Sequence, residues 1–151
     1  FQPICGFNYG AKLYGRVRES YTFTMSIMTM FLLFSGTLGF IFAPDIIGFF
    51  RNEDPELIAI GSRVLRWQCV SFPLIGLSTS TNMLLQTLRK TLPATILSMC
   101  RQGIFFLPIL YIAPMLLGLQ GVEMTQALAD VLTFLLAIPI AVKTSKNLKD
   151  L

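Results

Sequence analysis

Hydrophobic positions form long uninterrupted stretches, and most of the charged residues lie in the short segments between them. Three of these stretches contain no Asp, Glu, Lys or Arg: 20–44, 67–88 and 102–122. A helix of about 20 such residues can cross the roughly 30 Å hydrocarbon core of a bilayer. A fourth stretch, 121–142, is long enough as well but contains Glu123 and Asp130. It can span a membrane only if these carboxylates find partners or water.

The pattern predicts an all-α fold, a polytopic membrane helix bundle in which residues 1–151 form one membrane domain. The expected elements are a partial helix at 1–12 and spans at about 20–44, 64–88, 93–115 and 121–142. Prolines and glycines support these edges, because proline favours the first turn of a helix and glycine favours turns. Pro73, Pro108 and Pro139 lie inside spans, where each can kink its helix. The first residues read as the second half of a helix, so we expect a fragment of a longer protein.

Composition agrees with a membrane protein and weighs against other classes. The chain is 54% hydrophobic and 13% charged, against about 25% charged in soluble domains. Its basic residues lie mostly near helix ends and not on one face, so a nucleic-acid partner is not expected. There is no histidine and no CxxC spacing among the three cysteines, and no nucleophile and base constellation. We expect no metal, no cofactor and no enzymatic activity, and the lipid bilayer as a partner.

Basic residues near helix ends favour the cytoplasmic side of a membrane. They form three clusters, at 12–18, 89–101 and 143–149, whereas the segment 45–66 has mixed charge and the connector 117–121 has no basic residue. The three clusters therefore belong on one side, which predicts a cytoplasmic C-terminus.

Polar residues form a stripe along one face of the expected span at 64–88. At 100° per residue its members fall within an arc of about 100°. They are Gln68, Ser71, Ser78, Thr79, Asn82 and Gln86. Such residues either form interhelical hydrogen bonds or line a water-filled or substrate cavity, and their number favours the cavity. The opposite face is expected to contact lipid through Val70, Leu74, Leu77, Leu84, Leu85 and Leu88.

Asp130 lies nine residues into the last span, about 14 Å deep at 1.5 Å per residue. An unpaired charge there costs about 2.5–3.5 kcal/mol, so the face that carries Glu123, Gln126 and Asp130 must turn into the bundle. Two roles stay open for Asp130, a proton or cation site and a protonated or hydrogen-bonded packing carboxylate. Arg101 lies about two turns into the third span, where it can reach headgroups or pair with an acid. In the first segment, Gln2 and Asn8 are polar at membrane depth.

Three elements of the sequence form a specific combination: QPICGFNYGAK at 2–12, TNMLLQTLRKTLPATILSMCRQGIFFLPILYIAP at 81–114 and GLQGVEMTQALADVLTFLLAIP at 118–139. Together they resemble the C-terminal lobe of MATE multidrug and toxic-compound efflux transporters. The resemblance implies the C-terminal part of a twelve-helix, two-lobe fold, with the end of helix 8 and helices 9 to 12 present and the N-terminal lobe absent. The span at 64–88 has no acid, as in the DinF-like branch of the family.

The resemblance also implies a function. It is export of cationic, amphiphilic drugs or metabolites by alternating access, in exchange for Na⁺ or H⁺, across what we expect to be a bacterial inner membrane. Helices 8 and 10 contribute to the substrate cavity in this family, which places Gln2, Asn8 and the polar stripe there. Two alternatives are a flippase for lipid-linked or polysaccharide precursors and a membrane scaffold subunit that does not transport. A flippase needs a strongly cationic cavity to hold the pyrophosphate of its substrate, and Arg101 is the one basic residue well inside these spans.

Overall fold

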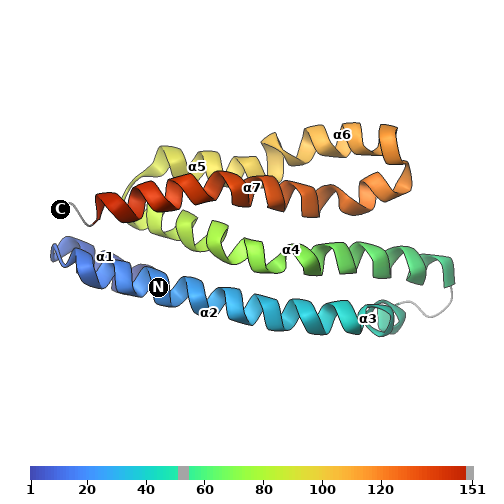
Figure 1. Ribbon diagram of the computed structural model, residues 1–151, viewed down its shortest axis with the longest axis horizontal. Coiled ribbons are helices and arrows are strands. Elements are labelled where there is room, and N and C mark those ends of the chain that lie inside the picture. The colour runs from blue at the N-terminus through green and yellow to red at the C-terminus, as the bar shows by residue number, and fades with distance from the viewer. Residues whose placement is uncertain (51–54, 149–151) are drawn as a thin grey trace.

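The computed structural model describes residues 1–50 and 55–148, which form an elongated bundle of helices (Figure 1). Successive long helices run antiparallel to one another, and the described residues contain no strand. The elements are α1 (Gln2–Gly10), α2 (Tyr14–Ile41), α3 (Ala43–Phe50), α4 (Pro55–Thr87), α5 (Thr91–Met99), the π-helical segment η1 (Cys100–Ile104), α6 (Phe106–Leu117) and α7 (Leu119–Asn147). The predicted all-α membrane bundle is confirmed.

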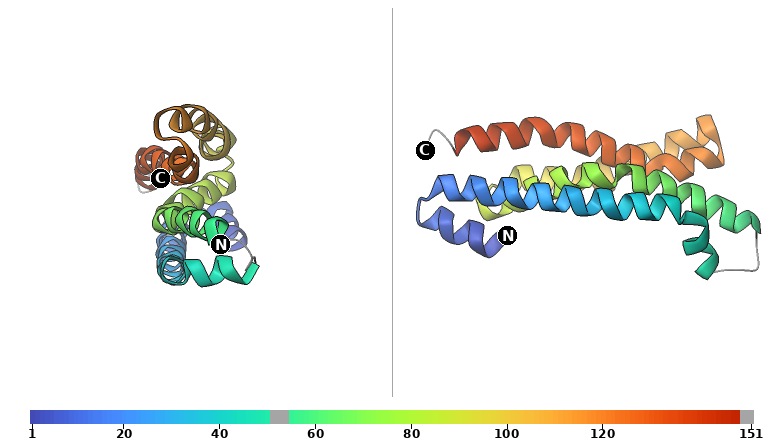
Figure 2. Two further views of the ribbon diagram at one scale, coloured as in Figure 1. Left: turned by 90° about the vertical axis from the view of Figure 1, so that its right-hand side faces the viewer. Right: turned by 60° about the horizontal axis from the view of Figure 1, so that its bottom comes forward.

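Three of the described helical stretches are long and apolar enough to cross a membrane: Tyr14–Ile41, Thr91–Leu117 and Leu119–Asn147. Helix α4 is longer than any of them, at 33 residues, but its polar stripe makes it less apolar. It begins at Pro55, well before the expected start at residue 64. The expected span at 20–44 is the α2 helix, which begins earlier and is followed by α3. Helix α3 turns across the end of the bundle (Figure 2). The sequence Asn52-Glu53-Asp54-Pro55 is typical of a turn in which the proline starts a helix; α4 begins at Pro55, and the other three residues lie outside the described residues.

Helix α4 is the centre of the bundle, because it packs against α2 on one side and α7 on the other (Figure 2). This position overturns the prediction that Leu84, Leu85 and Leu88 face lipid, since all three are buried. Leu84 and Leu88 join Cys5 of α1 in an apolar core near one end of the bundle. The prediction failed because neighbouring helices cover this side of α4: residues of α1 and α2 pack around Leu84 and Leu88, and residues of α5 and α7 lie around Leu85.

Small residues allow α2 and α4 to approach closely. A Cβ atom on Gly76 of α4 would lie 2.5 Å from Oγ1 of Thr29 and 3.1 Å from its Cα atom. Nearby, the hydroxyl of Ser80 donates to Sδ of Met28 at 3.4 Å. Close contact through small residues is how membrane helices gain van der Waals packing, because lipid provides no hydrophobic drive between them.

The expected third span is interrupted by η1. The N–H of Phe105 donates to the carbonyl of Cys100 at 3.0 Å, five residues back instead of four. Pro108 lies in the first turn of α6 and has no N–H to donate to the carbonyl of Ile104. The irregularity therefore precedes the proline that was expected to produce a kink, and it turns the α5 and α6 halves onto different courses (Figure 1).

The turns at one end of the bundle share an unusual backbone. Lys12 and Arg89 have φ angles of +58° and +57°, the left-handed conformation that glycine normally adopts at the end of a helix. In each turn the next residue donates its N–H to a carbonyl five residues back, Leu13 to Asn8 at 2.8 Å and Lys90 to Leu85 at 2.9 Å. These turns and the last turn of α7 lie at the same end of the bundle (Figure 1). The described residues at 12–18, 89–90 and 143–148 thus lie towards one end of the bundle, as predicted (Figure 1), whereas Arg101 lies deeper and pairs with Asp130.

Candidate functional site

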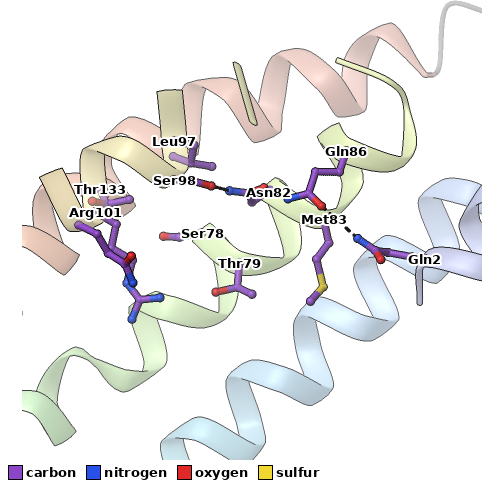
Figure 3. Close-up of a pocket in the computed structure, with 11 residues that line it drawn as sticks. Gln2, Ser78, Thr79, Asn82, Met83, Gln86, Leu97, Ser98, Arg101 and Thr133 are labelled. Carbon is purple, nitrogen blue, oxygen red and sulfur yellow. Dashed lines mark hydrogen bonds between the residues drawn. The ribbon is translucent and has the colours of Figure 1, made fainter. Parts of the chain in front are cut away.

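A polar cavity of about 320 Å³ lies beside the second half of α4. Its walls come from α1, α4, α5, η1 and α7, so five separate elements build it (Figure 3). The lining residues are Gln2, Ser78, Thr79, Asn82, Met83, Gln86, Leu97, Ser98, Arg101, Gln102 and Thr133. Most of these side chains carry an amide or a hydroxyl group, which is unusual for a space between membrane helices.

A chain of hydrogen-bonded amides runs along one wall (Figure 3). Nε2 of Gln2 donates to Oε1 of Gln86 at 3.3 Å, and Nε2 of Gln86 donates to Oδ1 of Asn82 at 2.7 Å. Nδ2 of Asn82 then donates to Oγ of Ser98 at 2.5 Å and to the carbonyl of Ala94 at 3.2 Å. The chain links α1, α4 and α5 and fixes the amide groups at the cavity wall.

The structure places five of the eight predicted cavity residues in this lining: Gln2, Ser78, Thr79, Asn82 and Gln86. The other three do not line it. Gln68 and Ser71 lie on the same face of α4 but two to three turns nearer its N-terminal end, where both donate to Asp130. Asn8 is buried, and its amide donates to the carbonyl of Ile4 within α1 at 2.9 Å. Angular position alone predicted the face of α4 but could not say that α7 fills the space beside residues 68 and 71.

Asp130 accepts hydrogen bonds at both carboxylate oxygens. Oδ1 accepts from Nε of Arg101 at 2.8 Å and from Nε2 of Gln126 at 3.3 Å. Oδ2 accepts from Oγ of Ser71 at 3.0 Å and from Nε2 of Gln68 at 3.2 Å. The side chain of Asp130 is 1% exposed and that of Arg101 is 31% exposed. Four side chains thus satisfy the two carboxylate oxygens, and the guanidinium of Arg101 supplies the positive charge beside them.

The second acid of α7 is paired in the same manner. Oε1 of Glu123 lies 3.0 Å from Nη2 of Arg63, and Nε of Arg63 contacts both carboxylate oxygens. The side chain of Glu123 is 2% exposed and that of Arg63 is 47% exposed. Both acids of α7 therefore meet arginines, which satisfies the condition under which the 121–142 stretch can span a membrane.

The sequence reasoning missed part of the lining, namely Met83, Leu97, Ser98, Gln102 and Thr133. Ser98, Arg101 and Gln102 are spaced by three and four residues, which places them on one helical face. This second polar stripe, on the expected 93–115 span, indicates the wall of the cavity that lies opposite α4. Thr133, three residues after Asp130, lies on the face of α7 that the acids already identified.

A helical bundle in which three described stretches are long and apolar enough to cross a membrane, with a polar cavity between its helices, is typical of integral membrane transporters. Comparison with known proteins gives the family: the model described as MatE matches residues 1–112, and the chain belongs to the MATE family. No curated protein sequence matches the chain.

Several solved structures share the fold. One is an inward-facing multidrug resistance MATE transporter of the MOP superfamily, with a TM-score of 0.89 and 19% identity over 99% of this chain and 35% of that one. The second is the bent form of Vibrio cholerae VcmN, with a TM-score of 0.85 and 19% identity over 97% and 33%. The third, described only as protein A, has a TM-score of 0.87 and 34% identity over 99% and 33%.

The chain thus spans about a third of the length of the structures it matches. The prediction of a MATE membrane transporter fragment, and not an enzyme, is confirmed. The finer assignment to the DinF-like branch stays a prediction, because none of these matches separates the branches of the family.

Proposed function

We propose that the chain is part of a secondary active antiporter that exports cationic or amphiphilic drugs or metabolites in exchange for Na⁺ or H⁺. One observation carries the proposal: the polar cavity beside α4, built from five elements of an otherwise apolar bundle. Concave sites in which polar groups from several elements converge are typical places for small molecules to bind. The side chains proposed to contact substrate are Gln2, Ser78, Thr79, Asn82 and Gln86.

The lining supplies neutral polar groups to the substrate and no carboxylate. The only described charge in it is Arg101, which Asp130 balances. The amide and hydroxyl groups can exchange hydrogen bonds with many different molecules, and Met83 offers a flexible, polarisable surface. The countercharge for a cationic substrate and the residues that bind the coupling ion are then expected in the N-terminal lobe. Alternating access would move the cavity between the two sides of a bacterial inner membrane, with the C-terminus in the cytoplasm.

The flippase alternative is not favoured. A pyrophosphate-bearing precursor would need several cations in its site, and the described lining offers one that is already ion-paired. The scaffold alternative would leave the polar stripe buried and dry between helices. The cavity beside Thr79 and Asn82 speaks against that.

The test is transport by the full-length protein that contains this chain. Cells that express it take up a fluorescent cationic dye under an imposed Na⁺ or proton gradient. The variants are Asn82→Ala and Gln86→Ala, which remove two members of the amide chain. The control is Gln120→Ala, because Gln120 is an exposed amide at the start of α7 and does not line the cavity.

We expect lower dye accumulation with the wild type under one of the two gradients, and weaker efflux in the two cavity variants but not in the control. Dependence on one gradient would name the coupling ion. Accumulation that neither gradient changes would overturn the antiporter proposal. Efflux that is equal in all variants would remove the amide chain from the substrate path.

A further inference from the structure

A groove runs between α2 and α7 on another face of α4. Both helices pack against α4 but make hardly any contact with each other, so a space of about 330 Å³ remains with Leu77 of α4 as its floor. Its walls are formed by Arg18, Tyr21, Thr22 and Met25 of α2 and by Ala141, Val142, Ser145 and Lys146 of α7. None of these residues belongs to the polar cavity described above.

The groove changes character along its length. Arg18 lies near the start of α2 and Lys146 near the end of α7, and these two helix ends lie at the same end of the bundle (Figure 1). Moving inward along α2, Met25 follows Arg18 by seven residues, about 10 Å at 1.5 Å per residue. Moving inward along α7, Val142 and Ala141 follow Lys146. The mouth of the groove thus carries two cations, Arg18 and Lys146, and the hydroxyl groups of Thr22 and Ser145. Apolar side chains line the deeper part.

The two cations at the mouth are available to a ligand. Among the described residues neither Arg18 nor Lys146 forms an ion pair, and both are exposed. The described lining contains no acid. The hydroxyl of Tyr21 is already bonded to Oγ1 of Thr81 at 2.9 Å, which leaves the ring of Tyr21 as an apolar wall.

We propose that this groove binds an anionic glycerophospholipid, with the headgroup phosphate between Arg18 and Lys146 and an acyl chain over Met25, Leu77 and Val142. A glycerophospholipid has a charged headgroup at the bilayer surface and a hydrocarbon tail beneath it, and the groove likewise has a charged mouth and an apolar deeper part. The negative phosphate complements the two positive side chains at the mouth. Basic pockets between membrane helices bind anionic headgroups in this manner. Free phosphate would use only the mouth and leave the apolar part empty. The proposal is independent of what the polar cavity transports.

The test uses the full-length protein in detergent, titrated with phosphatidylglycerol and, separately, with the zwitterionic phosphatidylcholine, with bound lipid counted by native mass spectrometry. The charge variant is Arg18→Gln with Lys146→Gln. Its control is Arg16→Gln, which removes an exposed cation of α2 that does not line the groove. The filling variant is Thr22→Trp, which keeps both cations. Its control is Phe23→Trp, because Phe23 is the exposed neighbour outside the groove.

We expect the wild type to bind phosphatidylglycerol more tightly than phosphatidylcholine. The charge variant should bind phosphatidylglycerol about tenfold more weakly or worse and lose the preference. The Thr22→Trp variant should lose binding of both lipids, whereas both controls should behave as the wild type does. Equal binding of the two lipids by the wild type, or an unchanged preference in the charge variant, would overturn the proposal. Absence of lipid binding by the wild type would also overturn the proposal. That result is expected if the rest of the transporter covers the groove.

Discussion

Nε of Arg101 lies 2.8 Å from Oδ1 of Asp130, and this contact joins η1 to α7 in the middle of the bundle. The carboxylate is buried, while the guanidinium reaches the wall of the polar cavity. The contact therefore connects the packing of α7 with the shape of the cavity. It also gives the irregular η1 segment a fixed neighbour, because the residue after Cys100 is held by a side chain of α7.

Removal of Arg101 is predicted to be among the most destabilising changes in the chain. Arg101→Met leaves the carboxylate of Asp130 buried without its countercharge, which typically costs about 3–5 kcal/mol. Thermal unfolding of the purified full-length protein should show a clear fall in Tm. The control Arg16→Met removes an exposed arginine and should leave Tm nearly unchanged.

The same ion pair allows a second variant that separates pairing from packing. Arg101→Met combined with Asp130→Leu removes both charges and should recover part of the lost stability, since apolar replacements of a buried pair are often neutral. If the double variant is less stable than Arg101→Met alone, the unpaired charge of Asp130 is not the cause of the lower stability of Arg101→Met.

Glu123 makes a parallel case nearer the other end of α7. Arg63→Ala is predicted to destabilise the protein, because Glu123 is buried and loses all three of its hydrogen bonds to Arg63. The loss should be smaller than for Arg101→Met, because Arg63 is 47% exposed and water can replace part of the interaction. Arg66→Ala is the matched control, since Arg66 contacts Phe40 and no described acid. Equal Tm values for the two alanine variants would contradict this reading of the Arg63 pair.

Gly121 is predicted to tolerate no side chain. A Cβ atom there would overlap the carbonyl oxygen of Ala113, which is backbone and cannot rotate away. Gly121→Ala must then separate α6 from α7, at a cost of about 1–3 kcal/mol or more for overpacking. Gly15→Ala, in the first turn of α2 with open space around it, is the control and should be neutral or slightly stabilising. Limited proteolysis of the α6–α7 hairpin, alongside Tm, would detect the separation.

Arg89 offers a change in the stabilising direction. Its φ angle of +57° is strained for a residue with a Cβ atom, by about 1–2 kcal/mol, so Arg89→Gly is predicted to raise Tm. Lys90→Gly removes the same charge from the next position, where φ is −84° and glycine brings no relief. Because Lys90 is the N-cap of α5, where glycine is tolerated, that control should leave Tm nearly unchanged. A Tm of Arg89→Gly that does not exceed that of Lys90→Gly would show that the backbone at Arg89 is not a source of strain.

The sequence predicted the parts of this molecule that depend on local pattern. Charge-free length gave the membrane helices, and the spacing of Glu123 and Asp130 showed which face of α7 turns inward. The burial of Leu84 and Leu88 could not be predicted, because it depends on α1 and α2 covering α4 and not on α4 itself. The η1 segment was missed for a related reason. A proline indicates that a hydrogen bond is lost, but the neighbouring helices decide where the backbone adjusts.

The division of the α4 stripe into two parts leads to the last prediction. Single cysteines are placed at Thr79, Asn82 and Ser71 in a background that lacks Cys5, Cys69 and Cys100, and membranes are treated with a membrane-impermeant thiol reagent. Thr79 and Asn82 line the cavity and should be labelled, whereas Ser71 is buried against Asp130 and should not. Labelling at all three positions would mean that water also reaches the Asp130 cluster, which would return that carboxylate to the candidates for ion coupling. Labelling at none would show that the stripe is packed and dry, and the cavity would then have no role in transport.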